Sequence, residues 1–286
     1  MSSRPERIAG FLLLAALAGC AALRHGGPES SLAPPSRYAI YYGHAPVYEA
    51  LDRYDWVIVA DDFPPERLSR TRYFAYLSIG EIDRDGPIRT RLEHRVGHKA
   101  FRKILLAKND AWRSWVADIR NPAFRKILLE QADRDRQNGY RGLFLDTLDS
   151  PLAYETDHPV SGKGLARAIV TFIRELRRRH PRTPLVVNRG FAVLPRIARD
   201  VSGVLFEDFC SMYDETRRRY VFVPADTRNR EMAKVRDARR ENPSLVVLAL
   251  DYGFRRDIHR RERCADMARE KGFVPYFAVR NLDTVP

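Results

Sequence analysis

The sequence GLFLDTLDS, residues 142–150, places four apolar or small residues directly before Asp146. Burying a carboxylate costs free energy unless it is paired. A carboxylate at the end of a segment suited to burial therefore indicates a partner or a function. The same pattern, an apolar run closed by acidic residues, returns twice: GVLFEDF (203–209) with Glu207 and Asp208, and LVVLALDYG (245–253) with Asp251. The repetition indicates that these runs are strands of one kind with a shared role at their ends.

Eight short apolar runs are candidate strands. They are continuously apolar rather than alternating, which favours strands covered on both faces, as in a parallel sheet. In chain order they are YAIYY (38–42), WVIVA (56–60), YFAYLSI (73–79), GLFLD (142–146), LVVN (185–188), GVLFE (203–207), LVVLALD (245–251) and FVPYFAV (273–279).

The segments between the candidate strands have helical patterns. Asn121-Pro122 is a good helix start and Asn138-Gly139 a good stop. An apolar stripe with helical spacing runs from Leu165 to Leu176, and further helices fit three ranges: 191–199, 226–241 and 257–271. Eight strands with helical crossovers in 286 residues predict a single-domain (β/α)₈ TIM-like barrel over residues 37–286.

An open, doubly wound sheet is the alternative fold. Against it, no glycine-rich phosphate loop follows the first strand, and the G-x-S-x-G motif of α/β-hydrolases is absent. One departure from an ideal barrel is visible, because only DDFPPERLSRTR separates the second and third candidate strands. We therefore expect a short second crossover whose helix is short or missing.

A barrel of this kind brings the carboxyl ends of its strands to one mouth, where catalysis takes place. The polar residues at or just after those ends are Asp61, Asp62, Glu81, Asp146, Asn188, Glu207, Asp208 and Asp251. Carboxylates that lie close together have two main uses. They can act as acid/base and nucleophile in the hydrolysis of a glycosidic bond, or they can bind a hard cation such as Mg²⁺. No histidine lies at a candidate strand end, which argues against a zinc site.

Four motifs resemble the endo-α-1,4-polygalactosaminidase family of glycoside hydrolases: YLSIGE (76–81), WVADIRNPAF (115–124), GYRGLFLDTLD (139–149) and VLFEDF (204–209). The resemblance extends from about Tyr38 to the end of the chain, and related hydrolase domains occur in bacterial exopolysaccharide systems. It implies a TIM-like barrel that cleaves α-1,4-linked galactosamine polymers, with Asp146 as nucleophile and Glu207 as acid/base. The long segment 82–114 and the short second crossover depart from the family pattern.

Residues near the predicted mouth are candidates for binding a sugar chain. The polar candidates are Asp62, Glu81, Asp149, Asn188, Asp208 and Asp251. The aromatic candidates are Tyr42, Trp112, Trp115, Tyr154, Tyr213 and Tyr252, with Trp115 equally suited to a core position. We expect Tyr154 and Tyr213 in loops that follow the catalytic strands.

The charge pattern indicates the class of partner. The formal net charge is +13, yet the predicted mouth is acidic, which would attract a cationic amino-sugar polysaccharide. The basic residues lie mostly on predicted helices, as in RELRRRH and RRDIHRRER, rather than in one patch interleaved with aromatic residues. We therefore expect no nucleic-acid partner, while the outer arginines could hold anionic lipid headgroups.

The first residues have the features of a lipoprotein signal peptide. Arg4 and Arg7 precede an apolar stretch too short to span a bilayer, and Leu17-Ala18-Gly19-Cys20 resembles a lipidation site. This pattern predicts cleavage after residue 19, lipidation of Cys20 and a Gly-, Pro- and Ser-rich tether through residue 36. The expected location is the cell envelope, with the protein anchored to a membrane as a lipoprotein.

Cys210 and Cys264 are the two remaining cysteines. Two cysteines make no metal site, and the sequence leaves open whether they form a bridge or stay as buried thiols, the default expectation.

Three functions fit the pattern as a whole. The leading one is a retaining endo-glycosidase that needs no cofactor or metal and acts on an amino-sugar polymer. The second is a Mg²⁺-dependent barrel lyase or phosphodiesterase that uses the same carboxylates. The third is a non-catalytic, glycan-binding lipoprotein.

Overall fold

The computed structural model describes residues 34–60, 62–65 and 69–285. Its centre is a sheet of eight parallel strands, in the spatial order β1 (Tyr38–Tyr41), β2 (Trp56–Val59), β3 (Arg72–Ser78), β7 (Gly142–Asp146), β8 (Leu185–Asn188), β9 (Gly203–Glu207), β12 (Val246–Tyr252) and β13 (Val274–Ala278). All eight predicted strands are present within one or two residues of their expected ends. The signal peptide, Cys20 and most of the tether lie outside the described residues.

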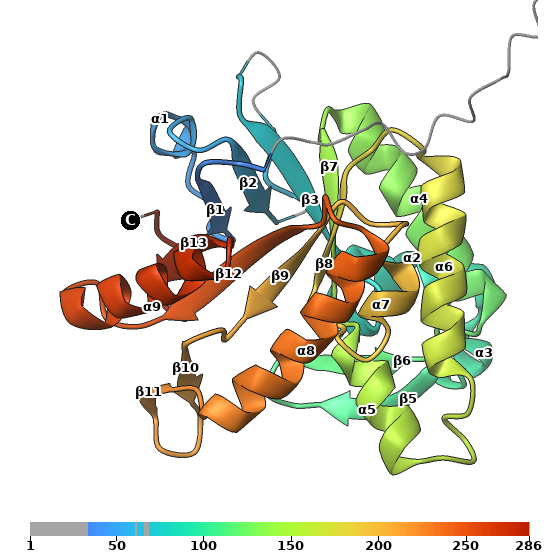
Figure 1. Cartoon of the computed structure of the whole chain (residues 1–286). Helices are drawn as coiled ribbons and strands as arrows, with labels where there is room; N and C mark the ends of the chain where they lie inside the picture. The colour runs from blue at the N-terminus through green and yellow to red at the C-terminus, as the bar shows by residue number, and fades with distance from the viewer. Residues whose placement is uncertain (1–33, 61, 66–68, 286) are drawn as a thin grey trace, which may run out of the picture.

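The sheet curves into a nearly closed barrel, which confirms the predicted fold (Figure 1). Its two outer strands meet through side-chain and loop contacts. The Tyr276 hydroxyl donates to the Ile40 carbonyl at 3.3 Å, and the Tyr42 amide donates to the Leu282 carbonyl at 2.7 Å. The carboxyl ends of all eight strands therefore surround one mouth.

Helices connect the strands and cover the outside of the barrel. They are α1 (Tyr48–Leu51), α4 (Pro122–Asn138), α5 (Asp149–Asp157), α6 (Leu165–Arg179), α7 (Leu194–Ile197), α8 (Ala225–Glu241) and α9 (Ile258–Glu270). The Asn121 side chain caps α4 by accepting from the Ala123 and Phe124 amides, and Gly139 ends it in a left-handed conformation. The helix expected over 191–199 is shorter, since only residues 194–197 are helical.

Two crossovers depart from the regular pattern. Between β2 and β3 the described residues contain no helix, as expected for a short second crossover. The connection from β3 to β7 instead carries an extra unit ahead of α4: β4 (Glu81–Asp83), α2 (Pro87–Val96), α3 (His98–Arg102), β5 (Leu105–Asn109) and β6 (Ser114–Ala117). Its strands form a small antiparallel sheet in the order β4–β6–β5, which accounts for the long segment 82–114.

A hairpin of β10 (Ser211–Asp214) and β11 (Arg219–Phe222) follows β9. In Figure 1 this hairpin and the small sheet both lie below the barrel, at the end toward which the strand arrows point. They therefore flank the mouth.

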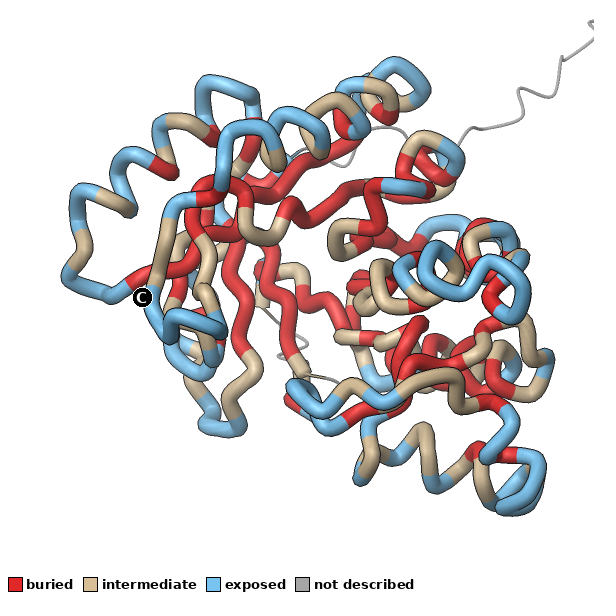
Figure 2. Tube along the Cα trace, turned by 90° about the horizontal axis from the view of Figure 1, so that it is seen from below, coloured by how far each residue is buried: buried red, intermediate tan, exposed pale blue. Residues whose placement is uncertain are grey.

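The core forms between the barrel strands and the helix layer. Strand residues such as Leu145, Val187 and Val204 are fully buried, and the predicted stripe of α6, from Leu165 to Leu176, packs against them. Figure 2, which views the molecule from below, shows buried strands enclosed by helices with exposed outer faces. Within the described residues, every helix is too short or too polar to cross a membrane.

Candidate active site

Asp146 and Glu207 lie at the ends of β7 and β9, and Asn188 ends the strand between them. The Asn188 Nδ2 atom donates to Asp146 Oδ1 at 2.9 Å and to Glu207 Oε2 at 2.7 Å. Because both oxygens accept from the same nitrogen, their separation cannot exceed the sum of these distances, 5.6 Å. One amide therefore holds the two carboxylates together across three neighbouring strands.

Each carboxylate also has its own tyrosine donor. The Tyr76 hydroxyl of β3 hydrogen-bonds Asp146, and the Tyr252 hydroxyl of β12 donates to Glu207 Oε1 at 2.6 Å. Burial and the nearby charge of Glu207 raise the pKa of Asp146 to about 6, although the bonds from Asn188 and Tyr76 act in the opposite direction. The pair is therefore partly desolvated and electrostatically coupled.

A residue with left-handed backbone follows each of these three polar residues. Thr147, Arg189 and Asp208 have φ angles of 64°, 50° and 58°. Such angles cost a non-glycine residue about 1–3 kcal/mol and are concentrated at functional sites. The chain thus turns sharply just after Asp146, Asn188 and Glu207.

Two of the left-handed residues use their side chains to hold the site. Thr147 Oγ1 accepts from the Gly80 amide at 2.9 Å and lies 2.8 Å from Ser78 Oγ. The Arg189 guanidinium donates to the Glu207 carbonyl and Asp149 Oδ2, both at 2.9 Å, and to Glu231 Oε1 at 2.6 Å. Arg189 therefore ties the end of β9 to the start of α5 and to α8.

Asp146 and Glu207 lie in a cleft of about 950 Å³ at the mouth. The predicted site residues that line it are Tyr42, Glu81, Trp112, Asp146, Asp149, Asn188, Glu207 and Tyr252. Other lining residues, outside the predicted set, include Tyr76, Ser78, Asp83, Asn109, Arg189 and Arg280. Tyr76 lies within a strand and Arg189 one residue beyond a strand end, so inspection of strand ends alone misses both.

Glu81 is buried at the edge of the cleft, and its oxygens are occupied by protein donors. Asn109 Nδ2 donates to it at 3.0 Å, and the hydroxyls of Ser114 and Ser150 also donate. These bonds join β4, β5, β6 and α5. The geometry gives Glu81 a role in fixing the small sheet to the barrel.

Asp208 and Asp251 do not line the cleft, because successive strand residues face opposite sides. Asp208 follows the inward-facing Glu207, and burial together with the Glu207 charge raises its pKa to about 8. The strand β12 continues through Tyr252, which faces the cleft, so Asp251 points the other way. The Asp251 carboxylate accepts from the Cys210 and Ser211 amides at 2.5 and 2.8 Å.

Three more predicted binding residues also lie away from the cleft. Asp62 is exposed and lies 3.4 Å from His44 Nδ1. Tyr154 is on α5 and stacks on His158, while Tyr213 is on β10 and packs against Tyr220. The expectation that Tyr154 and Tyr213 lie in loops was wrong, because helix and strand begin soon after the catalytic strands.

Trp115 does not line the cleft either, and the guanidinium carbons of Arg84 and Arg89 lie 5.4 and 5.7 Å from the centre of its ring.

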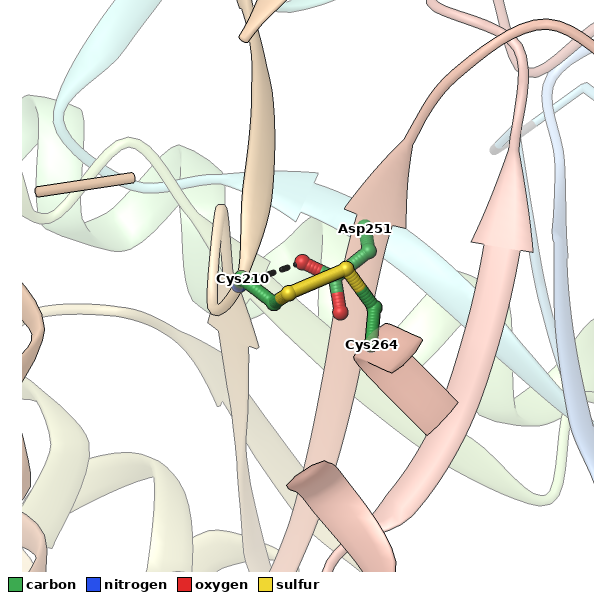
Figure 3. A group of neighbouring side chains, drawn as sticks. All are labelled: Cys210, Asp251 and Cys264. Carbon is green, nitrogen blue, oxygen red and sulfur yellow. Dashed lines mark hydrogen bonds between the residues drawn. A yellow bond between two sulfur atoms is a disulfide. The ribbon is translucent and has the colours of Figure 1, made fainter. Parts of the chain in front are cut away.

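Cys210 and Cys264 form a disulfide, so the default expectation of free thiols was wrong (Figure 3). Their Cα atoms are 5.4 Å apart, a normal span for a bridge. The bridge joins the turn after β9 to α9, beside Asp251. Although this trio is the candidate metal cluster among the described residues, its sulfur atoms are bonded to each other and cannot act as thiolate ligands.

Comparison with known proteins identifies relatives of this chain. The model of glycoside-hydrolase family GH114 matches residues 32–286. The glycoside hydrolase domain of PelA from Pseudomonas aeruginosa is 30% identical, with a TM-score of 0.75 over 88% of this chain and 97% of that domain. A search of curated proteins gave no match.

More distant structures share the fold. Ega3 from Aspergillus fumigatus, solved in complex with galactosamine, is 13% identical, with a TM-score of 0.63 over 88% of this chain and 94% of its own. An α-galactosidase from Thermus thermophilus is also 13% identical, with a TM-score of 0.55 over 91% of this chain and 60% of its own. The motifs, the barrel and the family match agree, and the chain belongs to glycoside-hydrolase family GH114.

Proposed function

We propose that the protein is a retaining endo-glycosidase that cleaves an amino-sugar polymer such as α-1,4-linked galactosamine. The observation that carries the mechanism is the Asp146–Glu207 pair, whose nearest oxygens lie within 5.6 Å of each other. Retaining glycosidases hold their two carboxyl groups about 5–5.5 Å apart, whereas inverting enzymes need about 6.5–9.5 Å to admit a water. An upper limit of 5.6 Å between these two oxygens supports the retaining arrangement.

The proposed reaction has two displacements. Asp146 attacks the anomeric carbon while Glu207 gives its proton to the departing glycosidic oxygen, which forms a covalent glycosyl–Asp146 intermediate. Glu207, now ionised, takes a proton from water as that water attacks the anomeric carbon and releases Asp146. Tyr76 and Tyr252 hold the two carboxyls in separate orientations, and Asn188 stabilises whichever of them is charged.

The charge of the cleft supports a cationic substrate. It is lined by five acidic residues, Glu81, Asp83, Asp146, Asp149 and Glu207, and by two arginines, Arg189 and Arg280, whereas the protein as a whole has a net charge of +13. The excess of carboxylates would attract protonated amino sugars. The galactosamine bound to Ega3, a protein of the same fold, supports this class of substrate.

The test is digestion of a panel of amino-sugar polymers that differ in linkage and acetylation, with and without a chelator. We expect α-1,4-galactosamine chains to be cut to short oligomers whose new ends first appear, by NMR, with the α configuration. Release of β ends would contradict retention. Loss of activity in the chelator would favour the Mg²⁺-dependent alternative.

The pH profile should reflect the raised pKa of Asp146. A nucleophile must be ionised, so kcat/KM should fall as the pH decreases through about 6, the value to which burial above all raises the pKa of Asp146. Replacing Asn188 with Ala removes a bond that lowers this pKa, and should move the acidic limb to higher pH. Initial rates at subsaturating substrate between pH 4 and pH 8 test this, and an unmoved limb would contradict it.

The location is proposed from the N-terminal sequence. If Cys20 carries lipid, wild-type protein should pellet with membranes, and Cys20→Ser should move it to the soluble fraction with unchanged specific activity. Mass spectrometry of the mature N-terminus is the direct measurement. A wild-type N-terminus without an acyl group would contradict lipidation.

A further inference from the structure

Trp112 is the most exposed tryptophan in the described part of the chain, yet it belongs to the cleft. Its side chain is 65% exposed and lines the same cavity as the catalytic pair. It lies in the turn between β5 and β6, in the sheet inserted between the third and fourth barrel strands. An aromatic face presented to a polar cleft is suited to stacking on the C–H face of a sugar ring.

The turn that carries Trp112 is held on several sides. Arg84 bonds Asp110, and Arg113 bonds Asp85 at 3.0 Å, which fixes the turn to the segment after β4. Behind the turn, buried Glu81 accepts from Asn109 and Ser114, as described above. The Arg84 amide also donates to the Arg113 carbonyl at 3.0 Å, so a backbone hydrogen bond as well as the ion pairs positions the turn that carries the indole.

A second contact reaches Trp112 from the far side of the mouth. The guanidinium carbon of Arg280, which follows β13, lies 5.9 Å from the Trp112 ring centre and 5.0 Å from that of Tyr213. Arg280 also pairs with Glu215 at 2.6 Å. This chain of contacts connects the small sheet to the β10–β11 hairpin and braces the indole.

A free carboxylate lies on the same wall. Asp83 of β4 is exposed, lines the cleft and pairs in register with Ser114, two residues after Trp112. Among the described residues it makes no ion pair, and its Oδ1 accepts only from the nearby Asp85 amide, at 3.2 Å. By contrast, Asp85 and Asp110 next to it are both paired with arginines.

We propose that Trp112 and Asp83 form an outer subsite that binds one protonated amino-sugar unit of the chain, away from the bond being cleaved. The indole would stack on the pyranose ring, and the Asp83 carboxylate would pair with its ammonium group. This inference rests on the proposed function and deepens it, since it assigns the recognition of chain length and of the free amine to the inserted sheet.

The stacking half is tested with defined galactosamine oligomers of increasing length. Trp112→Ala should lower kcat/KM about tenfold for oligomers long enough to reach the ring, with a smaller loss for shorter ones. Trp112→Phe should recover most of the loss, because a flat ring remains. Ile258→Ala is the control, since Ile258 on α9 is 50% exposed but does not line the cleft.

The charge half is tested with the same oligomers in free-amine and N-acetylated form. Asp83→Asn should lower kcat/KM about fivefold or more for the free amines and much less for the acetylated chains, which carry no ammonium. Asp266→Asn, an exposed aspartate on α9, controls for the loss of one negative charge. Calorimetric titration of the long oligomer into an Asp146→Asn background should show the same losses in affinity.

The outcomes separate the subsite from the proposed function. A uniform loss across all lengths for Trp112→Ala, or an equal loss on free and acetylated chains for Asp83→Asn, would overturn the subsite while the hydrolase proposal stands. If the wild type cleaves no amino-sugar chain, the proposed function fails. Calorimetry then still decides the subsite, because weaker oligomer binding by the Trp112 and Asp83 variants supports it and unchanged binding overturns it.

Discussion

Asp146→Asn and Glu207→Gln are each expected to lower the turnover of the polymer by about 10²–10⁴-fold or more, the contribution of a positioned acid, base or nucleophile. Asp146→Asn removes the atom that would form the covalent bond, and Glu207→Gln removes the proton donor. Both substitutions preserve shape. The new amide oxygen can accept from Asn188, and the new amide nitrogen can donate to the hydroxyl of Tyr76 or Tyr252, which is able to accept. The unfolding temperature should therefore change little.

The two roles can be separated by the leaving group. An activated aryl glycoside needs little protonation, so Glu207→Gln should keep much more activity on it than on the polymer. Asp146→Asn should stay inactive on both substrates, because the nucleophile is missing. The double variant should be little worse than the poorer single one, since the pair acts as a unit. Equal losses on both substrates for Glu207→Gln would contradict the acid/base assignment.

Leu145→Ala is expected to lower the free energy of unfolding by about 2–5 kcal/mol, the range for deleting a fully buried leucine side chain. Leu145 is 0% exposed and precedes the cleft-facing Asp146, so alternation turns it toward the helix layer. Leu205, which is 1% exposed and lines the cleft, should show a cost in the same range when it is changed to Ala.

Denaturant unfolding measures the change, with Val160→Ala as control because Val160 is 89% exposed. A shift within about 0.5 kcal/mol for Leu145→Ala, the range of ordinary surface sites, would contradict the packing described for β7.

The barrel could be predicted because each of its strands can be recognised from one short segment of the sequence. Each strand of a parallel sheet is apolar on both faces, so runs such as 142–146 and 203–207 stand out, and their acidic ends mark the mouth. The positions of Asp146, Asn188 and Glu207 follow from strand ends alone. The hydrogen bond that joins them does not, because it depends on the register between neighbouring strands.

It was harder to predict which residues near a strand end face the cleft. In the sequence Asp251 closes an apolar run, but the strand continues to Tyr252, and one residue reverses the direction of the side chain. Arg189 was missed because its side chain acts from beyond the strand, through a left-handed turn. The disulfide joins residues 54 positions apart, a proximity that exists only in the folded chain.

The three left-handed residues at the strand ends have a consequence for engineering. Thr147, Arg189 and Asp208 each occupy a backbone conformation that glycine adopts without strain, so glycine at these positions would relieve that strain. The same changes would remove the Thr147 hydroxyl from Gly80 and the Arg189 guanidinium from Glu207. Relief of backbone strain and retention of the contacts that hold the site would therefore oppose each other at Thr147 and Arg189, and a stabilised variant is better sought on the outer helices.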